Sequence, residues 1–165
     1  MAIIVSDANI FIDVDVAVLT LYMFRLPDEF ATPDILYQEE LSEHHPELPR
    51  LGLRIERLGS AVIADVDRMR ALYRAPSFND LLALALAKAR HWPLLTGDSD
   101  LRQVSDVEDV EVHGTIWLIE QMATARIISV EQARNGFKAM KDNGRRLPWP
   151  EADRLIRELA DGARK

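Results

Sequence analysis

Four acidic residues are placed along the chain so that they could together build one metal site. Asp7 and Asp98 each follow a short apolar run, Asp80 lies near the start of a predicted helix, and Glu40 lies toward the end of another. Magnesium and manganese are hard cations that take oxygen ligands. Carboxylates gathered without a neutralising lysine repel one another unless protons or a divalent cation fill the site. Such a site can orient a water, lower its pKa and stabilise charge on a phosphodiester.

Each acid also has a purely structural interpretation. Asp7 could cap the following helix, Asp98 could be a turn or cap residue, and Asp80 could close a capping box that begins at Ser77. Glu40 could belong to a solvated helix face. The joint arrangement, rather than any single residue, favours a functional site.

The elements needed to position these acids follow from hydrophobic patterning. Residues 2–5 predict a buried strand that leads into a helix over about 8–21. The pattern further predicts strands at 61–64, 93–96 and 110–112, helices at 33–42, 50–58, 65–73, 78–91 and from 99 to 107, and turn structure at 26–34. Short apolar strands that alternate with helices predict a parallel sheet covered on both faces. Open sheets of this kind bind ligands outside the carboxyl ends of their strands.

The last third of the chain is predicted to be helical. Segments 114–126 and 129–142 have the spacing of a helical hairpin, and a final helix is expected over about 150–161. The hairpin could pack on the core, form a homodimer surface or offer a groove to a partner's helix, and the pattern does not separate these.

Composition sets further bounds. The chain has 165 residues, no cysteine and a formal net charge of -7. An acidic chain is a poor general binder of nucleic acid, because phosphate contacts need lysine and arginine. The first residues do not resemble a signal peptide, and no apolar run is long enough to span a bilayer. We expect a cytoplasmic protein with no membrane partner.

The remaining charged residues are not placed at the strand ends or helix starts that would form the metal site. Asp13 and Asp15 are expected to be solvated, and the scattered histidines are not expected to bind metal. Arg145 and Arg146, beside Trp149, could hold RNA by phosphate pairing and stacking, or could lie in a solvent-facing turn with Trp149 packed on the core. A further set of arginines could flank a substrate path or pair with acids: Arg68, Arg70 and Arg74.

Four segments resemble the PIN-domain family in the family's order: IIVSDANIFID, TPDILYQEEL, SFNDLLALALAKA and LLTGDSDLR. The resemblance covers roughly residues 1–115. It implies a three-layer α/β/α fold with a short, mostly parallel sheet, and a catalytic core over 1–115. Residues 116–165 are then a C-terminal helical extension packed on the same domain. Members of the family are nucleases that cut RNA with magnesium or manganese, and many are VapC-like toxins of toxin–antitoxin pairs.

The resemblance also implies roles for individual residues. Asp7, Glu40, Asp80 and Asp98 match the family's acids, and Asp100 matches a further acid that some members use as a metal ligand. Small polar residues match positions that help to place the acids, water or substrate: Ser6, Asn9 and Thr96. Glu39 competes with Glu40, which is preferred because it precedes Leu41. The implied cofactor is Mg²⁺ or Mn²⁺, the substrate is RNA, and the implied partners are an antitoxin and a second copy of the chain in a homodimer.

Two other functions compete with a nuclease. A strand followed by Asp7 is similar to the start of haloacid-dehalogenase phosphotransferases, but these want a second aspartate where this chain has Asn9. A non-catalytic PIN-like module that binds a protein or RNA would suit the acidic charge, although all four acids are present. The segment 113–148 extends past the usual toxin core, so a nuclease is better supported than a toxin.

Overall fold

The computed structural model describes residues 2–163 and is built on a sheet of five parallel strands. Their order is β3-β2-β1-β4-β5. The strands are β1 (Ile3–Ser6), β2 (Glu29–Pro33), β3 (Arg54–Glu56), β4 (Leu94–Leu95) and β5 (Val112–His113). After β1, the chain adds β2 and β3 on one side of β1, and it later adds β4 and β5 on the other side. In open sheets, ligands bind at the carboxyl ends of the strands beside such a switch, here between β1 and β4.

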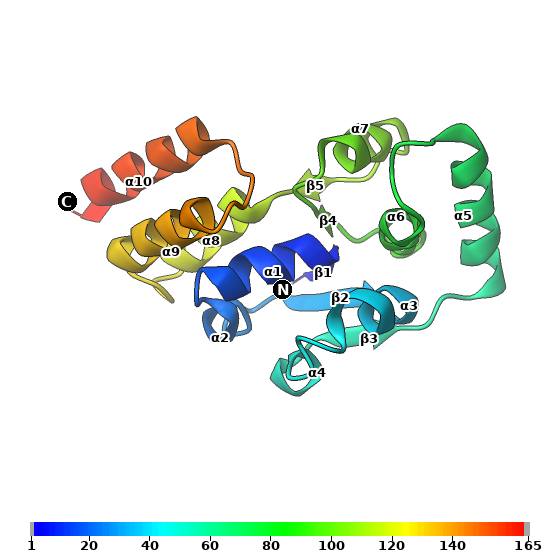
Figure 1. Cartoon of the computed structure of the whole chain (residues 1–165), viewed down its shortest axis with the longest axis horizontal. Helices are drawn as coiled ribbons and strands as arrows, with labels where there is room; N and C mark the ends of the chain where they lie inside the picture. The colour runs from blue at the N-terminus through cyan, green and yellow to red at the C-terminus, as the bar shows by residue number, and fades with distance from the viewer. Residues whose placement is uncertain (1, 164–165) are drawn as a thin grey trace.

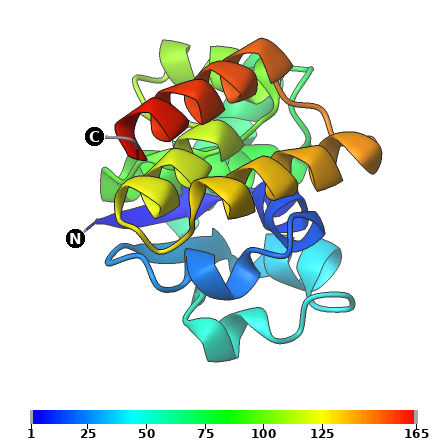
Figure 2. The same cartoon turned by 90° about the vertical axis from the view of Figure 1, so that its left-hand side faces the viewer.

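Helices cover both faces of the sheet. They are α1 (Ala8–Val16), α2 (Thr20–Met23), α3 (Asp34–Leu36), the π-helical turn η1 (Tyr37–Leu41), α4 (Leu48–Leu51), α5 (Ser60–Leu72), α6 (Phe78–Arg90), α7 (Ser99–Val107), α8 (Thr115–Thr124), α9 (Val130–Asp142) and α10 (Trp149–Ala163). Figure 1 shows α1, α8 and α9 on one side of the sheet and α6 on the other, with α5 outside α6. Helix α10 packs on α8 and α9 (Figure 2). The predicted three-layer α/β/α fold is confirmed.

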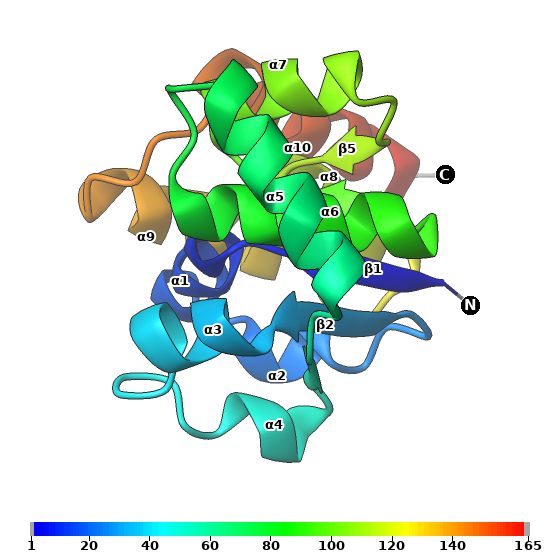
Figure 3. The same cartoon turned by 90° about the vertical axis from the view of Figure 1, so that its right-hand side faces the viewer.

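Helix α6 is the central helix of its layer. It contacts β1, β2 and β4 on one side and α5 on the other (Figure 3). Its interior LLALALA is buried at every position, which requires an apolar neighbour on each side. Ser77 and Asp80 form a capping box at its start, and His91 ends it in the left-handed conformation. The sequence therefore fixes the position where α6 begins.

The C-terminal helices join the same core as the sheet. Leu118, Ile119 and Met122 of α8 are buried, and α9 crosses α1 closely at Gly136. A Cβ at Gly136 would lie 3.2 Å from the Cβ of Ala17, so glycine permits this approach. The hairpin of α8 and α9 is thus packed on the core. Within residues 2–163, no helix combines the length and apolar character needed to cross a bilayer.

Several predictions of secondary structure were wrong. Residues 61–64, predicted as a strand, lie inside α5, and residues 26–34, predicted as a turn, contain β2. The predicted helix at 50–58 is replaced by α4 and the edge strand β3. A run of four apolar residues does not distinguish a strand from a helical turn. The prolines and acids of LPDEFATPD masked β2, whose Pro33 is its last residue.

Two element boundaries also differ. The helix predicted over 8–21 is interrupted, because Val18 has a positive φ of 60° and separates α1 from α2. The fourth predicted strand, at 110–112, is displaced to Val112–His113.

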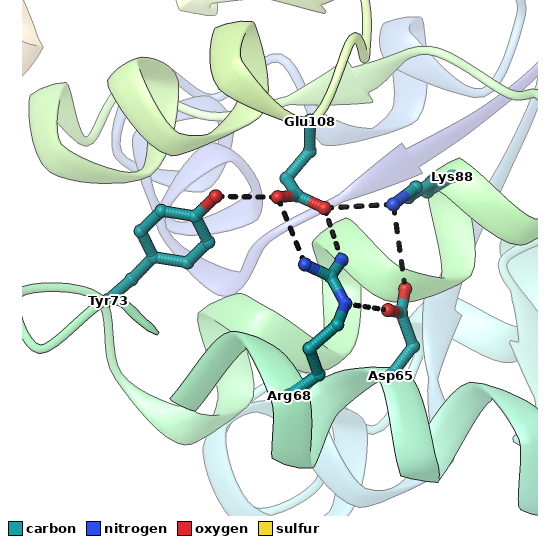
Figure 4. Close-up of polar contacts among 5 residues, drawn as sticks. All are labelled: Asp65, Arg68, Tyr73, Lys88 and Glu108. Atoms are coloured by element: carbon teal, nitrogen blue, oxygen red, sulfur yellow. Dashed lines mark hydrogen bonds and ion pairs between the residues drawn. The ribbon is translucent and has the colours of Figure 1, made fainter. Parts of the chain in front are cut away.

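A network of charges fastens α5 to the rest of its layer. Helix α5 fully buries Val66 and Met69, and Val62 and Ile63 are partly buried against the core. The carboxylate of Glu108, at the end of α7, accepts hydrogen bonds from three groups (Figure 4). They are the guanidinium of Arg68, the ammonium of Lys88 at 2.8 Å and the hydroxyl of Tyr73 at 2.6 Å. Arg68 also pairs with Asp65 at 2.8 Å. These contacts join α5, α6 and α7.

We predict that Glu108→Gln lowers the free energy of unfolding by about 1–2 kcal/mol, because it removes a charge that three donors share. The expected loss of stability is small because solvent screens the partly exposed Arg68 and Lys88. Urea unfolding followed by circular dichroism measures the loss. The matched control is Glu158→Gln, which changes an exposed glutamate of α10 and should leave stability unchanged.

The pH dependence of this loss has a definite sign. Hydrogen bonding from Arg68 holds the pKa of Glu108 at about 2, below its ordinary 4.5. The stabilisation is therefore complete above about pH 4.5 and disappears as pH falls toward 2. A difference between wild type and Glu108→Gln that stays constant through that interval would contradict the prediction.

Candidate active site

The carboxyl ends of β1 and β4 bring Asp7 and Asp98 to the same edge of the sheet. The pairing of Ser6 with Leu95 sets Asp7 beside Thr96. The buried Thr96 hydroxyl donates to Asp7 Oδ2 at 2.5 Å and accepts the backbone N–H of Asp98 at 3.1 Å. One threonine thus connects both acids.

Both aspartates also cap the helices that follow them. Asp7 Oδ1 accepts the N–H of Ile10 at 3.1 Å, and Asp98 Oδ1 accepts the N–H of Leu101 at 2.8 Å. The capping interpretation and the site interpretation therefore apply together. Capping fixes the orientation of each carboxylate, because one oxygen is held by the first turn of a helix.

Asp80 and Glu40 approach the same edge from other elements. Asp80 Oδ2 accepts the N–H of Ser77 at 3.0 Å in the capping box of α6. The preceding residue, Asn79, donates to Oε2 of Glu39 at 2.9 Å and of Glu40 at 3.1 Å. Glu40 lies on the π-helical turn η1 rather than on the regular helix that was predicted. Such wide turns alter the direction of the side chains that they carry.

The shifts in pKa show that these acids interact electrostatically. Burial raises the pKa of Asp7 to about 7, and the charge of Asp80 adds to this while Thr96 opposes it. Burial also raises the pKa of Asp80, and the nearby charge of Asp98 adds to the effect. Partial desolvation of its carboxyl group raises the pKa of Glu40, with contributions from Asp80 and Glu39. Asp80 is the neighbour common to the other three.

No cation among residues 2–163 neutralises this group of acids. Within residues 2–163, none of Asp7, Glu40, Asp80 and Asp98 forms a salt bridge. In the same range, no three His, Cys, Asp or Glu side chains converge into a ready-made metal cage. The buried Oδ1 of Asn79 has no hydrogen-bond partner, although Asn79 adjoins both glutamates. The donors are all oxygens, and this orphaned acceptor would suit the water shell of a hard cation.

Asp13 departs from its predicted solvated state. Its side chain is buried, where Thr115 donates to Oδ2 at 2.8 Å and Arg145 pairs with Oδ1 at 2.6 Å. Arg145 also donates to Oδ1 of Asn9 at 3.3 Å. The prediction for Asp13 was wrong because its neutralising arginine lies far along the chain. Asp15 is exposed, as predicted.

The two predicted RNA-contacting arginines border a small hollow beside Asp98. This hollow of about 270 Å³ is also lined by Asn9, Asp13, Gly97 and Gly144. Arg145 is held by Asp13, whereas Arg146 is exposed and forms no ion pair within residues 2–163. Trp149 packs partly buried against the core, with Lys141 over its ring at 5.8 Å. The turn therefore combines a core aromatic with one exposed arginine.

Other predicted residues lie less centrally. Asp100 is exposed in the first turn of α7, and its charge is not among those that raise the pKa of the other acids. Thr96 is fully buried with its hydroxyl engaged, so it positions acids rather than facing a substrate. Arg68 belongs to the Glu108 network, and Arg70 lies over the ring of Phe78 at 5.0 Å.

Three supporting residues were missed by the sequence patterns. Asn79 joins the two glutamates, Thr32 donates to the carbonyl of Ser6 at 3.2 Å, and Thr115 holds Asp13. Only Asn79 had a visible signal, since it precedes Asp80 in the helix start. The others depend on contacts between distant segments.

The fold and this acidic edge together define a class of protein. A parallel α/β/α sheet whose carboxyl edge gathers unpaired carboxylates has the donor chemistry of metal-dependent nucleases. A family model described as a PIN domain matches residues 3–161, and the chain belongs to the PIN-domain family. PIN domains are generally nucleases that act on nucleic acids with divalent metals. A search of curated proteins finds no significant match.

The raised pKa of Asp7 leads to a prediction for the metal-free protein. Because its folded-state pKa of about 7 exceeds the ordinary 3.8, the folded chain holds a proton that the unfolded chain releases. Stability therefore falls as pH rises through this interval, by an amount on the order of 4 kcal/mol. Asp7→Asn removes this penalty, and the variant should exceed wild type by roughly 1–4 kcal/mol at about pH 8, and by less at about pH 5.

Urea unfolding in EDTA at both pH values measures this gain. The control Asp67→Asn changes an exposed aspartate of α5 and should behave as wild type. Equal stability of Asp7→Asn and wild type at the higher pH would show that Asp7 carries no such penalty.

Proposed function

We propose that the chain is a divalent-metal-dependent endoribonuclease that hydrolyses RNA phosphodiester bonds. One observation carries the proposal. The carboxylates of Asp7, Glu40, Asp80 and Asp98 come from separate elements at one edge of the sheet. Beyond the effect of burial, the charge of Asp80 raises the pKa of Asp7 and of Glu40, and the charge of Asp98 raises the pKa of Asp80. No lysine or arginine pairs with these four acids within residues 2–163. Acids elsewhere in the structure, such as Glu108 and Asp13, are paired with cations of the chain. An external cation would complete this edge in the same way.

The oxygens left available support a ligand set for the proposed cation. Asp80 Oδ1, Asp98 Oδ2 and Glu40 Oε1 accept no hydrogen bond from the described part of the chain. These atoms would hold Mg²⁺ or Mn²⁺, with Asp7 completing the charge. When bound, such an ion supplies positive charge for the phosphodiester and lowers the pKa of a water. Asp100 is a further candidate from the family resemblance and lies two residues from Asp98.

The chain's own residues would then orient the reaction. In hydrolysis, a water oxygen forms a bond to phosphorus, the phosphorus bond to one sugar oxygen breaks, and that oxygen takes up a proton. Asp7 and Asp98 are held in fixed orientations by Thr96 and by their helix caps, which reduces the cost of arranging them for each turnover. Arg146, and Asn9 beside Arg145, are the proposed contacts to the RNA backbone near Asp98.

Glu40 is preferred to Glu39 as the second acid. Both accept hydrogen bonds from Asn79, but it is Glu40 whose pKa is raised by the charge of Asp80. This coupling ties Glu40 to the aspartates. The preference agrees with the family pattern in which the acid precedes a leucine, here Leu41.

We predict that wild-type protein cleaves single-stranded RNA in Mg²⁺ or Mn²⁺, that EDTA abolishes cleavage, and that Asp98→Asn slows it roughly 100-fold or more. The asparagine keeps the cap to Leu101 but removes a ligand charge, so the fold should persist. Cleavage of a fluorescently labelled RNA with circular dichroism of the same samples measures both.

The control for cleavage is Asp67→Asn, an exposed aspartate of α5, which should leave the rate unchanged. Equal cleavage by wild type and Asp98→Asn would overturn the proposal. Absence of cleavage in clean wild type, with RNA binding retained, would favour the non-catalytic PIN-like module.

The toxin role, its antitoxin partner and a homodimer belong to the proposal through the family resemblance alone. If the chain is a toxin, induced expression should arrest bacterial growth, while Asp98→Asn should not. Expression of a small protein encoded next to it should restore growth by binding it. Unimpaired growth at a verified level of soluble wild-type protein would remove the toxin role and leave the nuclease proposal intact.

A further inference from the structure

A second and larger hollow adjoins the acidic edge. It encloses about 530 Å³ and lies between the ends of β4 and β5, the starts of α7 and α8, and the connection from α9 to α10. Asp13, Gly97 and Arg146 line both this hollow and the smaller one beside Asp98. The volume falls within the roughly 300–1,000 Å³ typical of small-molecule sites. Because the two hollows share lining residues, an RNA strand that passes Asp98 would reach this larger hollow next.

A stacked aromatic pair forms part of the wall. The rings of His113 and Trp117 lie 4.0 Å apart at their centroids with an interplanar angle of 15°. His113 ends β5, and Trp117 lies in the first turn of α8, so both are fixed by regular elements. Trp117 is half-buried. Aromatic side chains in such hollows are the usual platforms for unstacked bases of single-stranded nucleic acid.

Two arginines face the same hollow without acidic partners. Neither Arg102 nor Arg146 forms a salt bridge with a carboxylate in the part of the chain that the structure describes. The Arg102 guanidinium lies at the strand ends, where Nη2 is 3.5 Å from the carbonyl of Thr96. A Cβ at Gly114 would lie 3.1 Å from that nitrogen, so the glycine leaves room for it. The remaining N–H groups of both arginines are suited to phosphate oxygens.

Glu120 and Glu151 also line the hollow and restrict where a phosphate could lie. Glu120 lies three residues beyond Trp117 on α8, and Glu151 lies in the first turn of α10. A phosphate would be repelled by these glutamates and attracted to the arginines that adjoin the acidic edge. The glutamates can instead accept hydrogen bonds from base amino groups or sugar hydroxyls.

We propose that this hollow binds one nucleotide of single-stranded RNA next to the phosphodiester held at the acidic edge. Arg102 and Arg146 contact its phosphate, and its base stacks against the His113–Trp117 pair. The inference rests on the proposed nuclease function, because it supplies the neighbouring subsite of that same strand. It also accounts for how an acidic chain could bind RNA with a few well-placed arginines.

The test is binding of a fluorescein-labelled RNA hexamer by anisotropy in EDTA, so that no strand is cut. Arg102→Gln and Arg146→Gln should each weaken binding several-fold and reduce the slope of log K against log salt by roughly 0.7. Trp117→Leu should weaken binding roughly tenfold, whereas Trp117→Phe should retain most of it, because stacking needs only an aromatic face. Circular dichroism identifies any variant that fails to fold.

The matched control is Arg126→Gln, an exposed arginine beyond the far end of α8. If both pocket arginine variants bind the hexamer as this control does, the subsite is overturned while RNA cleavage by wild type still supports the nuclease. If wild type does not cleave but the pocket variants bind more weakly, the subsite stands and the nuclease proposal fails. No binding by wild type in EDTA, or by Asp98→Asn in Mg²⁺, also overturns the subsite.

Discussion

The buried hydrogen bond from Thr96 to Asp7 is the interaction on which the acidic edge depends. It joins the first residue after β1 to the first residue after β4, at the position where the order of strand addition reverses. Because the same hydroxyl accepts the N–H of Asp98, the distance between the two aspartates is set by sheet register rather than by flexible loops. A polar contact in this buried position is worth more than in water and costs more to lose.

Charge balance distinguishes this edge from the rest of the molecule. Glu108 is surrounded by donors and keeps a low pKa, and Asp13 is matched by Arg145. Asp7 and Asp80 are instead shielded from water, with neighbouring carboxylates and no ion pair within residues 2–163, so their pKa values rise. The fold therefore stores unfavourable electrostatic energy at one place. Such an arrangement is typical of functional sites, where a ligand supplies the missing charge.

The prediction from sequence succeeded where local signals were strong and failed where they were short. Helix α6 was predicted because a capping box precedes a long run of helix-forming residues, and β1 and β4 because apolar runs end at Asp7 and in Thr96-Gly97-Asp98. Strands β2 and β3 were missed because one holds a proline and acids and the other is a polar edge strand. Their strand character comes from pairing with β1 and with each other, which no local pattern reveals.

The sequence by itself determined which acids could act and which helix starts would orient them, because caps and strand ends are local features. Local patterns were enough to place Asp7, Asp80 and Asp98 at strand ends and helix starts. The tertiary structure decided that Glu40 is coupled to Asp80, that Asn79 bridges the two glutamates, and that Asp13 is buried against Arg145. These depend on segments 39 to 132 positions apart, and only the packing of the layers brings such segments together.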